Sequence, residues 1–277
     1  MNSFDRPLVI AGPCMAEDLD LMEKVCAHMV ELSKELNFQY VFKASYDKAN
    51  RSSTSSYRGP GLEQGLEWLG KIKKKYHVPV LTDIHEASQA AKVAEVCDYL
   101  QIPAFLCRQT DLLVAAVETG AFVNIKKGQF LVPAAMAEIV NKAKEAAENK
   151  GIPLRVAVCE RGASFGYGNL VVDMRSLATM AESKAPVIFD ITHSTQLPAS
   201  GGKTSSGERR FAPLLARSAA ASGYLSGFFL EVHTNPSQAK SDSDVQLTMA
   251  QADALLRQTL PVWENAKEFA ELDKSFT

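Results

Sequence analysis

Eight short apolar runs in the 277-residue sequence each end at, or lead into, a residue that can do chemistry. The residue types concerned are those that bind anions, transfer protons or ligate metal ions. The runs and their residues are 8–12 with Cys14, 40–43 with Lys43, 78–83 with Asp83, 99–103 with Gln101, 122–126 with Lys126, 154–161 with Arg161, 186–190 with His193 and 227–231 with Glu231. If the runs are parallel strands of one sheet, these residues face one site.

Positive charge gathers at or just after the ends of these runs, although the chain has a net charge of −2. The cations found there are Lys43, Lys48, Arg51, Arg58, Arg108, Lys126, Lys127 and Arg161. Cations crowded into a cleft repel one another, and bound phosphates or carboxylates relieve that repulsion. Each cation taken alone is as well explained by a surface position or an ion pair. The set as a whole indicates a site for two phosphates, or for a phosphate and a carboxylate.

A second group of residues offers ligands for a metal ion. Its members, Cys14, His193, Glu231 and Asp242, follow the first, seventh and eighth runs. One thiolate, one imidazole and two carboxylates suit a borderline divalent ion such as Mn, Fe, Co or Zn. The sequence holds no compact ligand motif, and a single Cys or His is more often a packing residue. His85 and His233 are alternative histidine ligands.

Helical patterns separate the runs and indicate how these residues are positioned. Apolar residues recur at helical spacing in 21–36, 61–76, 87–97, 111–120, 134–149, 174–183, 210–223 and 248–272. Strict alternation of strand and helix predicts a parallel sheet, and eight units predict closure into a (β/α)8 TIM barrel. The active site of that fold lies at the carboxyl ends of the strands. An open doubly wound sheet is the alternative, but no strand is followed by G-x-G-x-x-G.

The bulk properties fit one catalytic domain spanning residues 1–277, located in the cytoplasm. Hydrophobic residues make up 46% and charged residues 22%, as in ordinary globular proteins. The net charge gives no reason to expect nucleic acid or an anionic membrane as a partner. We find no apolar stretch of membrane-spanning length and no signal-peptide pattern. Five cysteines at irregular spacing predict a reducing compartment rather than a disulfide framework. The long loops 44–60 and 191–209 are expected to be functional.

Several long motifs stand at or near the ends of the apolar runs: IAGPC (10–14), FKASYDKANRSS (42–53), TDIHE (82–86), QIPAFLCRQTD (101–111), NIKKGQF (124–130), ERGASFGYGNLVVDM (160–174), DITHSTQLP (190–198) and EVHTNP (231–236). Together they closely resemble the 3-deoxy-D-manno-octulosonate-8-phosphate synthase family, also called 2-dehydro-3-deoxyphosphooctonate aldolase. The resemblance runs from about residue 8 to residue 250. The related heptulosonate-phosphate synthases typically read K-P-R-T-S where this chain reads KANRSS (48–53).

The resemblance implies a transferase of the aldol type that joins phosphoenolpyruvate to D-arabinose 5-phosphate, for lipopolysaccharide or pectin synthesis. It also implies a homotetramer. Because metal-independent members usually carry Asn at the position of Cys14, it implies the metal-dependent subclass. The alternatives are a heptulosonate-phosphate synthase acting on erythrose 4-phosphate, and a barrel that binds sugar phosphates without catalysis.

The resemblance also implies roles for individual residues. The matches to phosphoenolpyruvate contacts are Lys43, Lys48, Gln101, Lys126, Arg161 and His193. The pentose phosphate is expected at Asn50, Arg51 and Ser52, with Arg108 reaching in from a neighbouring subunit, and Asp83 is expected near the sugar hydroxyls. The metal ligands are Cys14, His193, Glu231 and Asp242, and the catalytic set is Lys48, Asp83, Lys126 and His193. The loop 198–210 departs from the family pattern, which leaves Lys203, Arg209 and Arg210 without a role.

Overall fold

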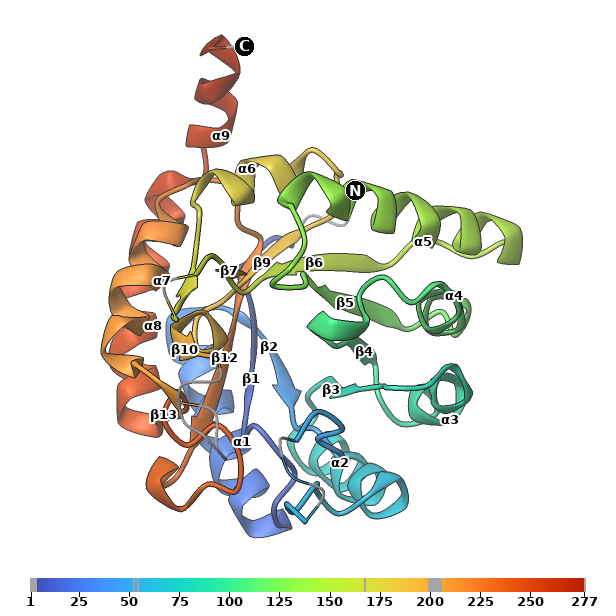
Figure 1. The fold of residues 1–277 in the computed structure, drawn as a ribbon. Helices are drawn as coiled ribbons and strands as arrows, with labels where there is room; N and C mark the ends of the chain where they lie inside the picture. Colours follow the sequence, from blue (N-terminus) through green and yellow to red (C-terminus); the bar gives the residue numbers. More distant parts are fainter. Residues whose placement is uncertain (1–3, 52, 54, 167, 199–205, 277) are drawn as a thin grey trace.

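The computed structural model describes residues 4–51, 53, 55–166, 168–198 and 206–276. In these ranges eight parallel strands close into a barrel, because the first strand pairs with both the second and the last (Figure 1). In barrel order they are β1 (Leu8–Gly12), β2 (Gln39–Lys43), β3 (Val80–Asp83), β4 (Tyr99–Ile102), β5 (Phe122–Lys126), β6 (Val156–Glu160), β9 (Val187–Asp190) and β12 (Gly227–His233). The predicted (β/α)8 barrel is confirmed.

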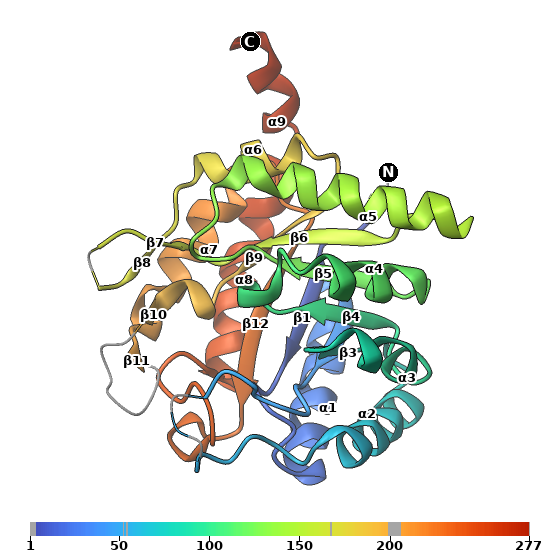
Figure 2. The ribbon, with the colours of Figure 1, turned by 45° about the vertical axis from the view of Figure 1, so that its right-hand side comes forward.

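Helices follow the strands and surround the barrel on its outside (Figures 1 and 2). They are α1 (Leu19–Leu36), α2 (Leu62–Tyr76), α3 (Ala90–Ala94), α4 (Thr110–Glu118), α5 (Met136–Lys150), α6 (Arg175–Ala181), α7 (Ala212–Ala220), α8 (Met249–Ala266) and α9 (Phe269–Leu272). The last helix, α9, extends away from the barrel in both views. No helix in the described ranges is long and apolar enough to cross a membrane.

Helix α1 shows how the local sequence sets these elements. The Asp18 side chain accepts a hydrogen bond from the Leu21 backbone N–H at 2.8 Å and so caps the first turn. Buried residues at helical spacing, among them Met22 and Met29, face the barrel. The helix ends at Asn37, whose φ of 54° is left-handed, a conformation that asparagine tolerates better than most residues.

The structure differs from the predicted elements at a few places. The helix expected over 248–272 is divided into α8 and α9. The helix expected over 87–97 is a 3₁₀ turn (Ala87–Gln89) followed by the short helix α3. There, the Gln89 side chain accepts hydrogen bonds from the backbone of His85 and Glu86, which fixes a 3₁₀ turn before α3. The strands β7 (Ala163–Ser164), β8 (Leu170–Val171), β10 (Gln196–Leu197), β11 (Ser206–Gly207) and β13 (Leu247–Thr248) were not predicted. Two residues are too few to show a strand period.

The barrel interior consists of an apolar layer beneath a polar one. The apolar layer is a buried cluster of Leu8, Ile10, Val41, Leu81, Ala157, Cys159, Ile188 and Phe229. Because side chains alternate along a strand, residues two positions further on also point inward. Val41 is thus followed by Lys43, and Phe229 by Glu231. The apolar layer closes the barrel, and the polar layer forms a floor at the carboxyl ends of the strands.

All five cysteines are free, which agrees with the expectation of no disulfides.

Candidate active site

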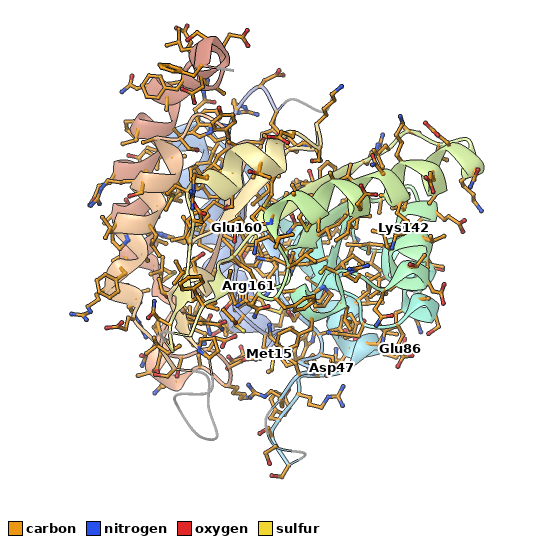
Figure 3. The ribbon with its side chains drawn as sticks, turned by 45° about the horizontal axis from the view of Figure 1, so that its top comes forward. Met15, Asp47, Glu86, Lys142, Glu160 and Arg161 are labelled. Atoms are coloured by element: carbon orange, nitrogen blue, oxygen red, sulfur yellow. The ribbon has the colours of Figure 1, made fainter. Side chains whose placement is uncertain are left out.

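A cavity of about 530 Å³ opens at the carboxyl ends of the strands. The predicted residues that line it are Lys43, Lys48, Asn50, Arg51, Asp83, Gln101, Lys126, Arg161, His193 and Asp242. Figure 3 labels two lining residues that come from different parts of the chain, Arg161 after β6 and Asp47 in the loop after β2. The carboxyl ends of the strands and the loops that follow them therefore bring together residues that are up to 199 positions apart, from Lys43 to Asp242.

The four predicted metal ligands meet at one side of this cavity. Ligand atoms of Cys14, Glu231 and Asp242 all lie within 4.8 Å of one another. The Nε2 atom of His193 lies 3.5 Å from Glu231 Oε1 and 3.9 Å from Asp242 Oδ2. In addition, Glu231 Oε2 is buried and has no hydrogen-bond partner among the described residues. A buried carboxylate oxygen without a partner, next to sulfur and nitrogen donors, fits a bound divalent cation.

The two alternative histidines occupy other positions. His233 lies with Nε2 3.7 Å from Glu17 Oε1, and its Nδ1 accepts a hydrogen bond from the Asn235 backbone at 2.9 Å. His85 also lines the cavity, but its imidazole ring packs edge-on against the ring of Tyr46. Geometry therefore favours His193 as the histidine of the metal-ligand group.

The protonation of this group depends on its burial. Burial, and then the negative charges of Glu231 and Asp242, raise the pKa of the Cys14 thiol well above its ordinary value. The thiol accordingly donates a hydrogen bond to Asp242 Oδ2 at 3.2 Å. A cation reverses this preference, because a coordinating thiol loses its proton. Metal binding to this chain should therefore release a proton from Cys14.

Asp242 is held in a backbone conformation that few residues adopt. Its φ is +48°, in the left-handed region where aspartate is among the better tolerated non-glycine residues. The Gln196 amide donates to its Oδ1 at 3.1 Å, and the backbone N–H groups of Val245 and Gln246 donate to its carbonyl. Gln246 also accepts a hydrogen bond from the Cys14 backbone at 3.1 Å. These contacts tie the loop after β12 to the end of β1, so that both carry ligands to one point.

Two lysines, the buried Lys43 and the partly exposed Lys48, lie near the metal ligands. Lys43 donates hydrogen bonds to Glu231 at 3.0 Å and to the Cys14 carbonyl at 2.9 Å. Burial lowers the pKa of the Lys48 ammonium group, but the negative charges of Glu231, Asp83 and Asp242 outweigh burial and raise it. Lys48 therefore stays charged, and the two side chains can bind an anion beside the metal ligands.

A second lysine–carboxylate pair lies at the end of β5. Lys126 donates a hydrogen bond to Asp190 Oδ2, and the ring centroid of Phe229 lies 3.3 Å from its ammonium nitrogen. The same Asp190 oxygen is 2.8 Å from His193 Nδ1. Burial opposes the charge of Asp190, but His193 and Lys126 hold the pKa of this carboxyl well below its usual range. Asp190 thus connects a predicted anion-binding residue to a predicted metal ligand.

Asp83 lies in a chain of hydrogen bonds on the opposite side. It accepts one hydrogen bond from the Ser45 hydroxyl and one from the Gln101 amide. Burial raises the pKa of Asp83, but Lys43, Lys48 and other neighbours lower it by more than burial raises it. The pKa of this carboxyl is therefore well below its usual range. The carboxylate is therefore a charged acceptor at the edge of the cavity.

Several predicted residues lie elsewhere or outside the described chain. Arg108 is exposed and is absent from the cavity lining, so a contact with substrate would have to come from a neighbouring subunit, as predicted. Arg58 pairs with Asp47 at 2.6 Å, and Lys127 lies 3.4 Å from Glu160. Ser52 and Lys203 fall outside the described residues.

The two arginines without a predicted role are both engaged near the site. Arg209 donates hydrogen bonds to the carbonyls of Ser243 and Asp244, and so supports the loop that carries Asp242. Arg210 pairs with Glu208 at 2.6 Å.

Sequence reasoning missed some residues of the site. Asp190 ends the seventh run and could have been found by the rule that identified Asp83 and Glu231. Asn124 and Ser45 carry no such signal, because one is inside a strand and the other follows Lys43 in a loop. Gln196 belongs to a short hairpin that the pattern did not predict.

A parallel barrel whose mouth joins buried lysines to a thiol, an imidazole and carboxylates is the arrangement of a barrel enzyme that can bind anions and offers ligands for a divalent metal ion. The family model described as the DAHP synthetase I family matches residues 3–268, and the chain belongs to this family.

Curated relatives agree with the family assignment and are named 2-dehydro-3-deoxyphosphooctonate aldolase. The protein from Fusobacterium nucleatum is 54% identical over 252 residues, which cover 91% of this chain and 88% of the relative. The protein from Methylibium petroleiphilum is 48% identical over 276 residues, covering 99% and 96%. That from Delftia acidovorans is 48% identical over 272 residues, covering 98% and 95%. The resemblance seen in the motifs is thus confirmed over nearly the full length.

Proposed function

We propose that residues 1–277 form one catalytic domain that condenses phosphoenolpyruvate, D-arabinose 5-phosphate and water. The products are 3-deoxy-D-manno-octulosonate 8-phosphate and inorganic phosphate. The observation that carries the proposal is one cavity in which buried Lys43 and Lys126 flank a convergent group of metal ligands. The family membership and the names of its relatives support the same reaction.

The reaction needs two anions and an aldehyde to be held in fixed positions. A bond forms between the enol carbon of phosphoenolpyruvate and the aldehyde carbon, water adds to the carbon that becomes cationic, and phosphate leaves. Lys43, Lys126 and Arg161 bind the phosphate and carboxylate of phosphoenolpyruvate, with help from Lys48 and Gln101. Charge placed in advance in a cavity of this kind stabilises the transition state without reorganisation.

The sugar phosphate binds on the side of the loop after β2. Asn50 and Arg51 line the cavity there. The Arg51 guanidinium is anchored by hydrogen bonds to the Ser241 hydroxyl at 3.0 Å and to the Tyr57 carbonyl at 3.2 Å. This anchoring orients a planar fork that suits phosphate. The resemblance of the motif assigns Ser52 to the same phosphate.

Cys14, His193, Glu231 and Asp242 hold a divalent transition ion (Mn, Fe, Co or Zn) in this proposal. Such an ion would supply positive charge and Lewis acidity, either to the aldehyde of the sugar or to a water molecule. Among the candidates for proton transfer, Lys48 remains an ammonium donor and Asp83 a carboxylate acceptor, as their pKa directions require. His193, between Asp190 and the ligand group, is the third candidate.

The chain works as a homotetramer in the cytoplasm in this proposal. Arg108 follows β4 and is exposed, outside the cavity of its own chain. Its proposed task is to reach the pentose phosphate of a neighbouring subunit.

The test is a phosphate-release assay with phosphoenolpyruvate and a panel of sugar phosphates. Arabinose 5-phosphate should give the highest kcat/KM, since KANRSS replaces the K-P-R-T-S of heptulosonate-phosphate synthases. Equal or better turnover of erythrose 4-phosphate would favour the seven-carbon synthase. Tight binding of both substrates without phosphate release would favour a barrel that only binds.

A further inference from the structure

Asn124 is buried inside the barrel, on β5, and does not line the cavity. In the register of the sheet it lies next to Gln101 on β4, which lies next to Asp83 on β3. The Asn124 Nδ2 atom donates a hydrogen bond to Gln101 Oε1 at 2.8 Å. Gln101 Nε2 in turn donates to Asp83 Oδ1. Three neighbouring strands therefore carry one directed chain of hydrogen bonds that ends at a carboxylate in the cavity.

The direction of this chain is fixed by its two ends. A carboxylate only accepts hydrogen bonds, so Gln101 has to turn its NH₂ group toward Asp83. The Gln101 carbonyl then faces Asn124, which has to offer an NH₂ group. An amide at position 124 meets this need, whereas a carboxylate does not, because it has no donor.

The position of Asn124 is costly for a residue that only packs. Barrel interiors are filled mainly by branched apolar side chains, and a buried amide loses its hydration. Asn124 is fully buried, and its Oδ1 has no hydrogen-bond partner among the described residues. The hydrogen bond that its side chain makes within those residues goes to Gln101. An apolar residue would fill this space at lower cost, so the amide is best explained by its effect on Gln101.

We infer that Asn124 is a positioning residue for the sugar substrate: through Gln101, it holds Asp83 as an oriented acceptor for a sugar hydroxyl. Each Asp83 oxygen uses one lone pair, for Gln101 or for Ser45, and keeps another for substrate. The inference rests on the proposed function, because it assigns the acceptor to the sugar side of that reaction. It separates this side from the lysines that bind phosphoenolpyruvate.

The first test is Asn124→Asp, which keeps the shape of the side chain and removes the donor when the carboxyl is ionised, so the KM values are measured up to alkaline pH. Gln101 then has to turn its NH₂ group toward residue 124, and its carbonyl repels Asp83. The KM for arabinose 5-phosphate should rise by about 10- to 100-fold, the range for losing a hydrogen bond to a charged group. The KM for phosphoenolpyruvate should rise by a smaller factor, because Gln101 only assists the lysines and Arg161 in binding that substrate. A loss of kcat with both KM values unchanged would overturn the inference.

Two further variants guard against a general loss of structure. Asn124→Leu introduces no charge and leaves Gln101 without a directing partner, so the sugar KM should rise by a smaller factor than in Asn124→Asp. Thr82→Val removes a buried hydroxyl from β3 that takes no part in the chain, and should leave both KM values unchanged. An effect of Thr82→Val equal to that of Asn124→Leu would mean that position 124 acts only through packing.

A double-mutant cycle tests the coupling directly. With Asp83→Asn, residue 83 can donate as well as accept, so a reversed Gln101 is tolerated. Asn124→Asp should therefore weaken arabinose 5-phosphate binding much less in the Asp83→Asn background than in the wild type. Calorimetric titration measures this in variants with low turnover. Additive losses would overturn the role of Asn124 and leave the proposed function intact, whereas a wild-type protein inactive with phosphoenolpyruvate and arabinose 5-phosphate would overturn both.

Discussion

The two sides of the barrel mouth stabilise buried carboxylates by different means. On the side of β1 and β12, Glu231 lies beside Asp242 and the Cys14 thiol, and Glu231 Oε2 has no hydrogen-bond partner in the described chain. On the side of β3 to β5, both oxygens of Asp83 accept hydrogen bonds from a neutral hydroxyl and amide. Lys43 and Lys48 lower the pKa of both carboxylates, but only Asp83 also has a neutral hydrogen-bond donor at each of its oxygens.

This difference separates two kinds of function within one cavity. Converging like charges cost free energy until a cation binds among them, so the β1 and β12 side is suited to hold an ion that can be removed. The hydrogen bonds from Ser45 and Gln101 to Asp83 form without any ligand, so this side can present an oriented acceptor before substrate binds. Substitutions on the first side should change how much metal is bound. Substitutions on the second side should change the orientation of the Asp83 carboxylate.

The largest expected effect is the loss of activity on removing the metal. Chelation should reduce phosphate release to background, and a divalent transition ion should restore it. Cys14→Ala should lose the ion while keeping its fold, because a barrel of this size buries enough apolar surface to fold without it. Metal content by atomic emission, circular dichroism and phosphate release report these three properties.

Two substitutions serve as controls for this prediction. Cys97→Ala removes a buried thiol far from the ligand group and should keep its metal. Cys14→Asn should retain more activity in chelator than Cys14→Ala if the ion mainly positions a reacting group, since an amide can hydrogen-bond the same group. Full activity of the wild type in chelator would contradict a metal-dependent mechanism.

The next largest effect is expected at Arg108. If it reaches the pentose phosphate of a neighbouring subunit, Arg108→Ala should lose a charged hydrogen bond of about 1.5–3 kcal/mol. The KM for arabinose 5-phosphate should then rise by about 10- to 150-fold, with little change for phosphoenolpyruvate. Steady-state kinetics together with analytical ultracentrifugation check this. A dilute monomer with full activity would show that each chain is complete by itself.

The sequence was sufficient for the barrel and for most of the charged residues in its mouth. Parallel strands are buried on both faces and appear as continuous apolar runs, so the strand ends could be located within about two residues. Lys43, Asp83 and Glu231 follow directly from that rule. The rule cannot identify Asn124, which lies two residues before the end of β5, because its function depends on the register between three strands. Register is a property of the folded sheet.

An intermediate effect is expected at Asp190, which lies 2.8 Å from His193 Nδ1. Carboxylates in this position orient a metal-binding imidazole, and their loss typically weakens metal affinity by about 10- to 100-fold. Asp190→Asn should weaken metal binding by that factor and also loosen Lys126, which donates to the same carboxylate. Competition with a chromophoric chelator measures the affinity. Asp83→Asn is the matched control: it neutralises a buried carboxylate on the other side and should leave metal affinity unchanged.

The smallest expected effect concerns stability in acid and compares the two sides without any ligand. The pKa of Asp83 is lower in the folded protein than the value of about 3.9 expected in the unfolded chain. A lowered folded-state pKa contributes stability that is complete above the unfolded pKa and is lost as pH falls below it. From about pH 4 downward, the unfolding free energy of the metal-free protein should therefore fall by up to about 1.4 kcal/mol per pH unit for this group.

Asp83→Asn should remove that part of the slope of unfolding free energy against pH, as measured by urea unfolding between about pH 3 and pH 6. Asp20→Asn, at an exposed carboxylate on α1, should leave the slope unchanged. If Asp83→Asn also leaves it unchanged, the lysines and the hydrogen bond from Ser45 do not hold Asp83 in its charged form, and Asp83 is not the fixed, charged acceptor that distinguishes this side of the mouth.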